Sequence, residues 1–235
     1  MKFTIIILSL ISSLNSLSQS VDIIKRSDLK KLPESEVFAI IEPITDTSKI
    51  NYVATIQGKD KNKKSNIEFL YFEIRKTATK IGANCFRIKS FERGGERNEA
   101  ILILDCYVAD EKTLKINIEN REKNVIYLFG NEREGDNSTS YKINGEEKEI
   151  KSGTFHKIII SENQKIRINK GGITGTTVTL NWENNKEPVF LTLTGFGLAS
   201  MDRQPINGIA FNTGGVNTIN NNNLGLLLTR LLKQE

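Results

Sequence analysis

The chain has 235 residues, of which 38% are hydrophobic and 26% are charged, and it carries a formal net charge of +5. This composition is ordinary for a globular protein and excludes a chain that is disordered throughout. The length allows one large domain or two small ones. Two cysteines are too few for a disulfide scaffold, so we expect the fold to depend on its hydrophobic core.

The N-terminus has the pattern of a secretory signal peptide. Lys2 provides a basic start, an apolar run extends from Phe3 to Ile11, and a small residue stands at Ser18. We therefore predict that residues 1–18 are cleaved and that the mature protein is secreted or periplasmic; cleavage after Ser20 is the alternative. An uncleaved membrane anchor is less consistent with the sequence, because a span requires roughly 20 apolar residues. The rest of the sequence contains no segment that we expect to cross a membrane.

Residues 19–48 form an N-terminal segment that is polar and basic at first. A short apolar run, Val37 to Ile41, is a candidate strand of the sheet that follows.

Residues 49–110 have the pattern of a βαββ domain, in which one helix packs on a small sheet. The first strand is expected at Asn51 to Gln57. Ser65 and Glu68 form an S-x-x-E capping box at the start of the helix, and Gly82 follows its last apolar residue. The helix has one apolar face with spacings of three and four, made by Ile67, Leu70, Tyr71, Ile74, Ala78 and Ile81.

Both cysteines lie in the two strands that are expected after the helix, Ala83 to Phe91 and Glu99 to Val108. A two-residue turn at Gly95-Glu96 would place Cys85 directly opposite Cys106. This pair would not be hydrogen-bonded, and side chains approach most closely at such pairs. The sequence therefore predicts a disulfide between Cys85 and Cys106, which an oxidising compartment would allow. Two buried free thiols are the alternative.

The order of these elements and the sequence Lys80 to Asn84 (KIGAN) resemble a group of bacterial envelope domains. The group includes the sensor lipoprotein of the Rcs stress pathway and the YbjQ-type domains, in which a helix ends in a Gly-Ala-Asn turn and leads into a strand. The resemblance covers residues 49–110 and implies an interaction or sensing role in the envelope. An older description of the YbjQ-type domains implies heavy-metal binding as an alternative.

Residues 113–200 show short stretches of strand composition separated by turns, which is typical of a β-sandwich. The first strand is expected at Leu114 to Ile118, where apolar and polar residues alternate, and Asn144-Gly145 is a strong hairpin signal. We place the domain boundary near Asp110 to Lys112 and expect the two domains to fold independently. Further strands are expected at 125–129, 141–143, 147–150, 154–160, 165–169, 176–182 and 189–196.

The phrase formed by Asn144-Gly145, Gly153-Thr154-Phe155 and Ile166-Arg167-Ile168 resembles bacterial envelope β-sandwich domains of unknown function and, more loosely, PEGA-type domains. This resemblance covers residues 113–196 and implies a fold without identifying catalytic residues. The expected fold class is therefore α+β: a βαββ module, an antiparallel β-sandwich and a short C-terminal helix.

Residues 201–223 are rich in Asn, Gly and Thr and are expected to be a flexible linker. Residues 224–235 are expected to contain an apolar helix, because the segment from Leu224 to Leu232 holds six leucines. A helix this short is marginal in water on its own. It must dock on its own domain, on another chain to form an oligomer through Leu224–Leu232, or on a membrane.

The sequence contains no recognisable catalytic, cofactor or metal motif. His156 is the only histidine and is expected to be structural. There is no C-x-x-C or H-E-x-x-H sequence, and the glycines of 171–175 lack the Lys-Ser/Thr of a phosphate-binding loop. A metal site built from Cys85, Cys106 and His156 would compete with the predicted disulfide.

These observations predict a non-catalytic, exported envelope protein with an interaction or sensing role and no cofactor. The mild excess of basic residues suits an anionic envelope polymer or an envelope protein as partner, whereas an exported protein rarely meets nucleic acid. The alternatives are a hydrolase that uses carboxylates to act on envelope polymers, and a metal-binding protein.

Overall fold

The computed structural model describes residues 19–29, 32–60, 67–94, 99–131, 135–171, 175–193 and 215–235. Within these residues the chain has three helices and 14 strands in three sheets, and the predicted α+β fold class is confirmed. The contacts divide the chain into two compact units. The first comprises Met1–Ile41 and Asp46–Thr113, and the second comprises Glu42–Thr45 and Leu114–Glu235.

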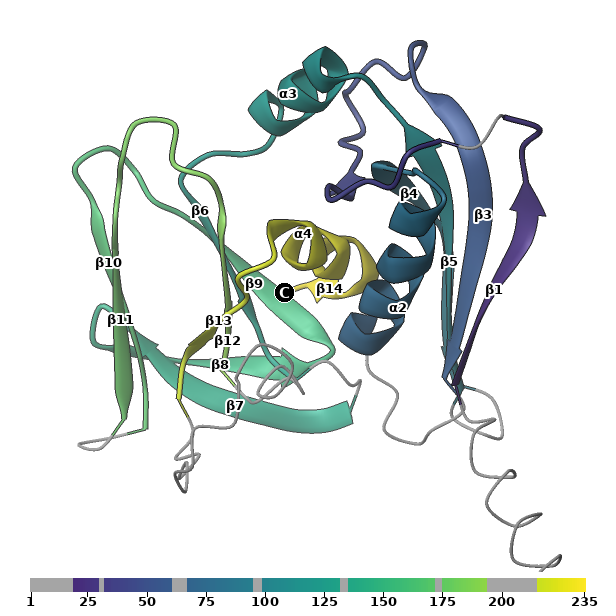
Figure 1. Ribbon diagram of the computed structural model, residues 1–235. Helices are drawn as coiled ribbons and strands as arrows, with labels where there is room; N and C mark the ends of the chain where they lie inside the picture. The colour runs from purple at the N-terminus through teal and green to yellow at the C-terminus, as the bar shows by residue number, and fades with distance from the viewer. Residues whose placement is uncertain are drawn as a thin grey trace, which may run out of the picture. The chain divides into compact units, whose positions relative to one another are not determined.

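The first unit contains a five-stranded sheet and helix α2 (Figure 1). Its strands in spatial order are β1 (Gln19–Arg26), β3 (Asn51–Asp60), β5 (Glu99–Val108), β4 (Cys85–Gly94) and β2 (Ala39–Ile40). The neighbours β1, β3, β5 and β4 are antiparallel, and β2 runs parallel to β4. The predicted β-α-β-β order is therefore confirmed as β3-α2-β4-β5, and β2 is the strand expected within Val37 to Ile41.

Helix α2 (Ile67–Lys80) covers one face of this sheet, which we call the inner face. The residues predicted for its apolar face are buried from Ile67 to Ala78, whereas Ile81 is partly exposed beyond the end of the helix. Gly82 has a φ of +84°, and a Cβ there would lie 2.3 Å from the Leu32 Cβ, so only glycine fits. The capping residue Ser65 and the turn at Gly95-Glu96 lie outside the described residues.

The second unit is a β-sandwich with a helix on its outside. One sheet has the order β11 (Thr176–Asn181), β10 (Lys165–Lys170), β7 (Gly135–Ile143) and β8 (Glu146–Ser152). The other has the order β13 (Asn217–Thr218), β12 (Val189–Thr192), β6 (Val125–Phe129), β9 (Thr154–Ile159) and β14 (Lys233–Gln234). Buried apolar residues of both sheets form one core, which includes Ile126, Leu128, Ile150, Ile166, Ile168 and Leu191.

The sandwich is not purely antiparallel, and this corrects the prediction. In the five-stranded sheet β12 runs parallel to β6, and β14 runs parallel to β9. Parallel neighbours need long connections, and both of these strands follow their partners only after several other elements.

The segment predicted as the first strand of the sandwich is instead helix α3 (Glu111–Glu119). Asp110 caps its N-terminus, because the Thr113 N–H donates to the Asp110 Oδ1 at 2.7 Å. The apolar alternation that suggested a strand includes Ile116 and Ile118, which are 42% and 41% exposed. The apolar residues of this segment therefore do not mark a buried face.

Helix α4 (Asn222–Leu231) confirms the predicted C-terminal helix and packs on the five-stranded sheet. Asn221 caps the helix by accepting from the Leu224 N–H at 3.0 Å. Gly225 lies against the Phe190 ring, and a Cβ there would come within 2.3 Å of it. Most of the leucines in this helix are buried in the chain, so an oligomer contact through Leu224–Leu232 has no support from the structure.

Part of the predicted flexible linker is ordered structure. β13 pairs antiparallel with β12, and Ile219 N–H donates to the Phe190 carbonyl at 2.9 Å. The asparagine run therefore serves to start α4 rather than to extend a linker. Residues 201–214 lie outside the described part of the chain.

We predict that deleting residues 224–235 lowers the melting temperature and increases the binding of a hydrophobic dye. The deletion uncovers Phe190 and removes buried leucines, each worth on the order of 1.5–3 kcal/mol. The matched control deletes only 233–235, which removes β14 but leaves α4 in place, and should cost much less. An unchanged melting curve and unchanged dye binding for the longer deletion would contradict the prediction.

Candidate functional site

The two cysteines do not pair across the hairpin as predicted. In the β4–β5 register Cys85 lies opposite Tyr107, and Phe86 lies opposite Cys106. Because side chains alternate between faces along a strand, Cys85 and Cys106 point to opposite faces of the sheet. Both are buried free thiols, which was the alternative reading of the sequence.

The predicted register is wrong for two reasons. The paired strands begin at Gly94 and Glu99 rather than at Gly94 and Arg97, so the connection is longer than a two-residue turn. A β-bulge between Ile88 and Ser90 then shifts the pairing back by one residue. Cys85 therefore lies opposite Tyr107 instead of Cys106. Neither feature has a signal in the sequence that would have been decisive.

Both thiols are expected to be unreactive, because their surroundings disfavour the thiolate form. Burial raises the pKa of Cys85 to about 12, although Arg87 opposes the shift. Burial also raises the pKa of Cys106, and the Asp105 charge and Cys85 add to it. Because the thiolate is the reactive and metal-binding form, neither residue is placed as a nucleophile or ligand at neutral pH.

We predict that the native protein reacts slowly with a thiol reagent at pH 8 and that both thiols react rapidly after denaturation. Cys85→Ser and Cys106→Ser serve as matched variants, and each should retain one slowly reacting thiol. A disulfide would give the opposite result: the unreduced mass would be lower by two hydrogens, and each variant would gain a free thiol.

His156 is held by two neighbours in the second unit. Its Nδ1 lies 2.7 Å from the Tyr141 hydroxyl, and its Nε2 lies 3.5 Å from the Glu235 Oε2. Glu235 also accepts from the Lys151 N–H at 3.1 Å and from the Thr154 hydroxyl at 3.0 Å. These contacts connect β9 with β7 and with the C-terminal residues.

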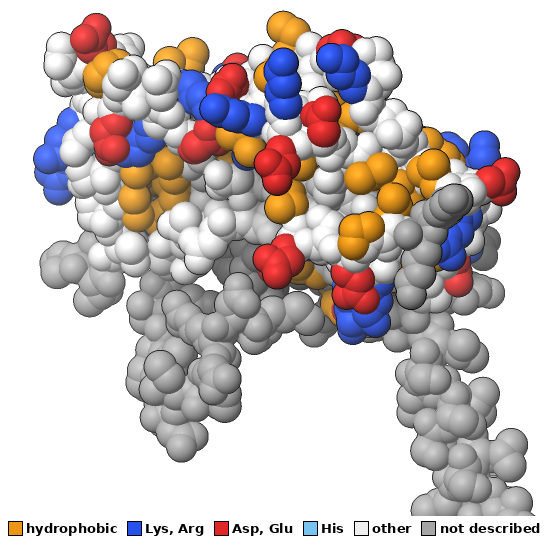
Figure 2. All heavy atoms as spheres, turned by 45° about the horizontal axis from the view of Figure 1, so that its top comes forward, with side chains coloured by type: hydrophobic (Ala, Val, Ile, Leu, Met, Phe, Trp, Pro, Cys, Tyr) orange, Lys and Arg blue, Asp and Glu red, His pale blue; other side chains and the backbone are white. Residues whose placement is uncertain are grey.

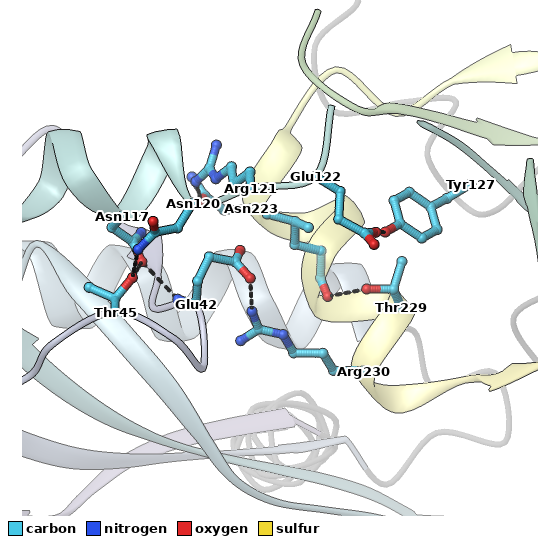
Figure 3. A network of polar contacts seen from close by, with 11 residues as sticks. Glu42, Thr45, Asn117, Asn120, Arg121, Glu122, Tyr127, Asn223, Thr229 and Arg230 are labelled. Atoms are coloured by element: carbon cyan, nitrogen blue, oxygen red, sulfur yellow. Dashed lines mark hydrogen bonds and ion pairs between the residues drawn. The ribbon is translucent and has the colours of Figure 1, made fainter. Parts of the chain in front are cut away.

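A network of polar contacts in the second unit joins the segment Glu42–Thr45 to α3 (Figure 3). The Glu42 N–H and the Thr45 hydroxyl both donate to the Asn117 Oδ1, at 2.7 and 2.9 Å. Asn120 in turn donates to the Thr45 hydroxyl oxygen at 3.1 Å. Asn117 is fully buried, so its carbonyl oxygen is satisfied by these two donors.

The same network holds α4 through two arginines. Arg230 donates to the Glu42 Oε2 at 2.8 Å, and Arg121 donates to the Asn223 Oδ1 at 2.8 Å. The Arg121 side chain is only 6% exposed and also lies 3.6 Å from the Glu187 carboxylate. Burial of such a cation requires partners of this kind, so these contacts explain how α4 is oriented.

Glu122 is the third carboxylate of this region. It accepts from the Tyr127 hydroxyl and from the Lys157 ammonium. Burial works against its charge, but these hydrogen bonds outweigh it and hold the pKa of Glu122 below its ordinary value. A catalytic acid would need a raised pKa instead. Glu42, Glu122 and Glu187 each pair with a cation, which is an arrangement that stabilises structure.

We predict that Glu122→Gln makes the stability of the protein less dependent on pH in the acid range. The pKa of Glu122 is lowered in the folded state, so its ionised form stabilises the fold above the ordinary pKa of 4.5, and this contribution disappears as the pH falls further. The difference in melting temperature between wild type and variant should therefore shrink below about pH 4. Glu119→Gln, at an exposed carboxylate of α3, is the control. A constant difference across the pH range would contradict this.

The outer face of the first sheet offers a different kind of site. In Figure 1, α2 lies on the inner face of this sheet, and no described element of the first unit lies on its other face. The register places Tyr52 opposite Tyr107, and their rings meet edge to face with centroids 5.9 Å apart. We call this surface the tyrosine face. It consists of Tyr52 and Tyr107 with Lys25, Arg87, Lys89 and Asp105 around them.

Hydrogen bonds fix the orientation of the Tyr52 ring. The Thr55 hydroxyl donates to the Asp105 Oδ1 at 2.5 Å, which leaves its oxygen to accept from the Tyr52 hydroxyl at 2.7 Å. Thr55 is fully buried beneath this surface. The aromatic part of the tyrosine face is therefore positioned before any ligand arrives.

Cationic side chains surround the two rings. The Lys25 ammonium lies 5.6 Å above the centre of the Tyr52 ring. Arg87 lies opposite Asp105 in the register, and the Lys89 ammonium is 3.8 Å from the Asp105 carboxylate. Burial and the Asp105 charge raise the pKa of Tyr107, although Arg87 opposes the shift, so this tyrosine remains a neutral hydroxyl. The tyrosine face thus contains three cationic side chains and one carboxylate, and Asp22 of β1 lies on the same face of the sheet.

On the surface drawn in Figure 2, basic and acidic side chains lie intermingled, with hydrophobic side chains between them. The described residues hold no group of three or more His, Cys, Asp or Glu side chains arranged to bind a metal. They also include no helix that is long and apolar enough to span a bilayer.

Comparisons with known proteins found no matching family model, no similar curated protein and no similar solved structure. The two resemblances to envelope domains therefore stay predictions. The signal peptide predicted at residues 1–18 lies outside the described part of the chain.

Proposed function

We propose that the protein is an exported, non-catalytic envelope protein that binds an anionic envelope polymer through the tyrosine face. The observation that carries this proposal is the pair of rings, Tyr52 and Tyr107, among cationic side chains on a sheet face that no described element of the first unit covers. Export is part of the proposal because of the signal-peptide pattern before Gln19.

The chemistry of the tyrosine face suits a polymer whose units carry both a ring and a negative charge. A tyrosine ring gives flat apolar area together with a polar tip. Arg87 can form paired hydrogen bonds with a carboxylate or phosphate, and Lys25 and Lys89 act as mobile point charges. Repeated units of a polymer would meet several of these groups in succession along the strands.

An interaction role also agrees with the structural contacts made by the ionisable side chains of the second unit. Glu42, Glu122 and His156 are engaged in contacts that hold the second unit together. The resemblance of residues 49–110 to envelope sensor domains supports the same role, and a sensing function would follow if polymer binding changed a further interaction.

We predict that the protein binds immobilised polygalacturonate, an anionic sugar polymer, more tightly than neutral dextran of similar length. Tyr52→Ala, Tyr107→Ala and Arg87→Ala should each weaken binding about tenfold, or ~1.4 kcal/mol, as measured by the dissociation constant. The binding should also weaken with added salt, because exposed charges are screened.

Lys115→Ala removes an exposed positive charge from α3 and is the matched control, which should bind like wild type. Melting curves of all variants establish that they are folded. Equal retention on the neutral and anionic polymers, or an equal loss for Lys115→Ala and Arg87→Ala, would contradict the proposed function.

A further inference from the structure

Strand β1 is an open edge of the first sheet. The spatial order of the sheet ends with the eight-residue β1 on one side and the two-residue β2 on the other. One side of β1 pairs with β3, and among the described residues no strand pairs with its other side, so its backbone groups there could accept a further strand. Proteins commonly use such an edge to pair with another extended chain.

The side chains of this edge are unusually apolar for an exposed strand. Ile23 is 39% exposed and Ile24 is 50% exposed. They lie side by side in the middle of β1, between the exposed charges of Asp22 and Lys25. An edge with exposed isoleucines is prone to pairing, so the identity of its partner matters.

A β-bulge brings the two charges to the same face of the sheet. Asp22 lies opposite Gln57 and Lys25 lies opposite Thr55, and the register skips Ile24 between them. Since Gln57 and Thr55 are two residues apart on β3, they share a face, and so do Asp22 and Lys25. This is the same outer face that carries the tyrosines.

This arrangement makes β1 complementary to a second copy of itself. If two β1 strands pair antiparallel with Asp22 of one copy opposite Lys25 of the other, both charge pairs form at once. Ile23 of each copy then lies opposite Ile24 of its partner. Opposed residues of an antiparallel pair point to the same face, so the charges meet on the outer face. Ile23 lies opposite the buried Ile56, so the isoleucines meet on the inner face.

We propose that β1 is a homodimer interface, in which two copies of this chain join their first sheets edge to edge in this register. The partner is a second copy rather than an unrelated peptide, because Asp22 and Lys25 of one β1 can pair with Lys25 and Asp22 of another. This inference does not rest on the proposed binding function, although Lys25 belongs to both surfaces.

The test is the dimerisation constant, measured by sedimentation over a range of protein concentrations. Wild type should show a concentration-dependent dimer. Asp22→Lys and Lys25→Asp each place like charges opposite each other twice in the dimer, and each should weaken dimerisation at least about tenfold. The double variant Asp22→Lys/Lys25→Asp restores both pairs in reverse and should dimerise like wild type.

A second measurement checks the register. Asp22→Cys and Lys25→Cys variants should form an intermolecular disulfide when mixed, and neither should do so efficiently alone. The native cysteines are buried and do not interfere. Lys115→Glu, at an exposed residue of α3, is the charge control and should leave the dimer unchanged.

Several results would overturn the proposal. These are a wild-type protein that stays monomeric at every concentration, a double variant that dimerises no better than the single ones, and cross-linking within each cysteine variant alone. A monomer that nevertheless binds polygalacturonate would overturn the dimer while leaving the proposed function intact.

Discussion

The five-stranded sheet of the second unit is apolar on both faces, and much of the surrounding structure follows from this. All five residues of β6 are buried, so the strand cannot lie with one side in water. One side meets the other sheet of the sandwich, through Ile126 and Leu128. The other side presents Tyr127, Phe129 and Phe190, which need a cover, and α4 provides it. Gly225 permits the close approach to Phe190, and Arg230 and Asn223 then fix the helix to Glu42 and Arg121.

The elements with strong local patterns could be predicted from the sequence, and those decided by distant partners could not. The apolar face of α2, the glycine after it and the leucines of α4 carry their own signals. The strand β1 is exposed at most positions, so its sequence shows no buried pattern. For α3, a capping aspartate outweighed an apolar alternation whose isoleucines are largely exposed. The pairing of the cysteines depended on a bulge, which a count of residues along the hairpin does not reveal.

The candidate site was missed for a related reason. Tyr52 and Tyr107 are far apart in the sequence, and each occurs in a strand where a tyrosine is unremarkable. Only the β3–β5 register brings the two rings together, and only the hydrogen bonds from Tyr52 to Thr55 and from Thr55 to Asp105 fix the Tyr52 ring. The sequence did offer one clue to this site. Thr55 and Asp105 are polar residues in strands that are otherwise rich in apolar residues, and buried polar groups require partners.

The open face and the open edge of the first sheet share one residue, Lys25. Its ammonium lies over the Tyr52 ring, and the same side chain would face Asp22 of a second copy. A cation between an aromatic ring and a carboxylate can serve both, but a polymer anion at the tyrosine face would compete for it. Binding at the face and pairing at the edge would therefore influence each other, and thermodynamic linkage requires that the influence be mutual. Joining two copies edge to edge would also align two tyrosine faces on one continuous sheet, and two linked sites bind a long polymer more tightly than either site alone.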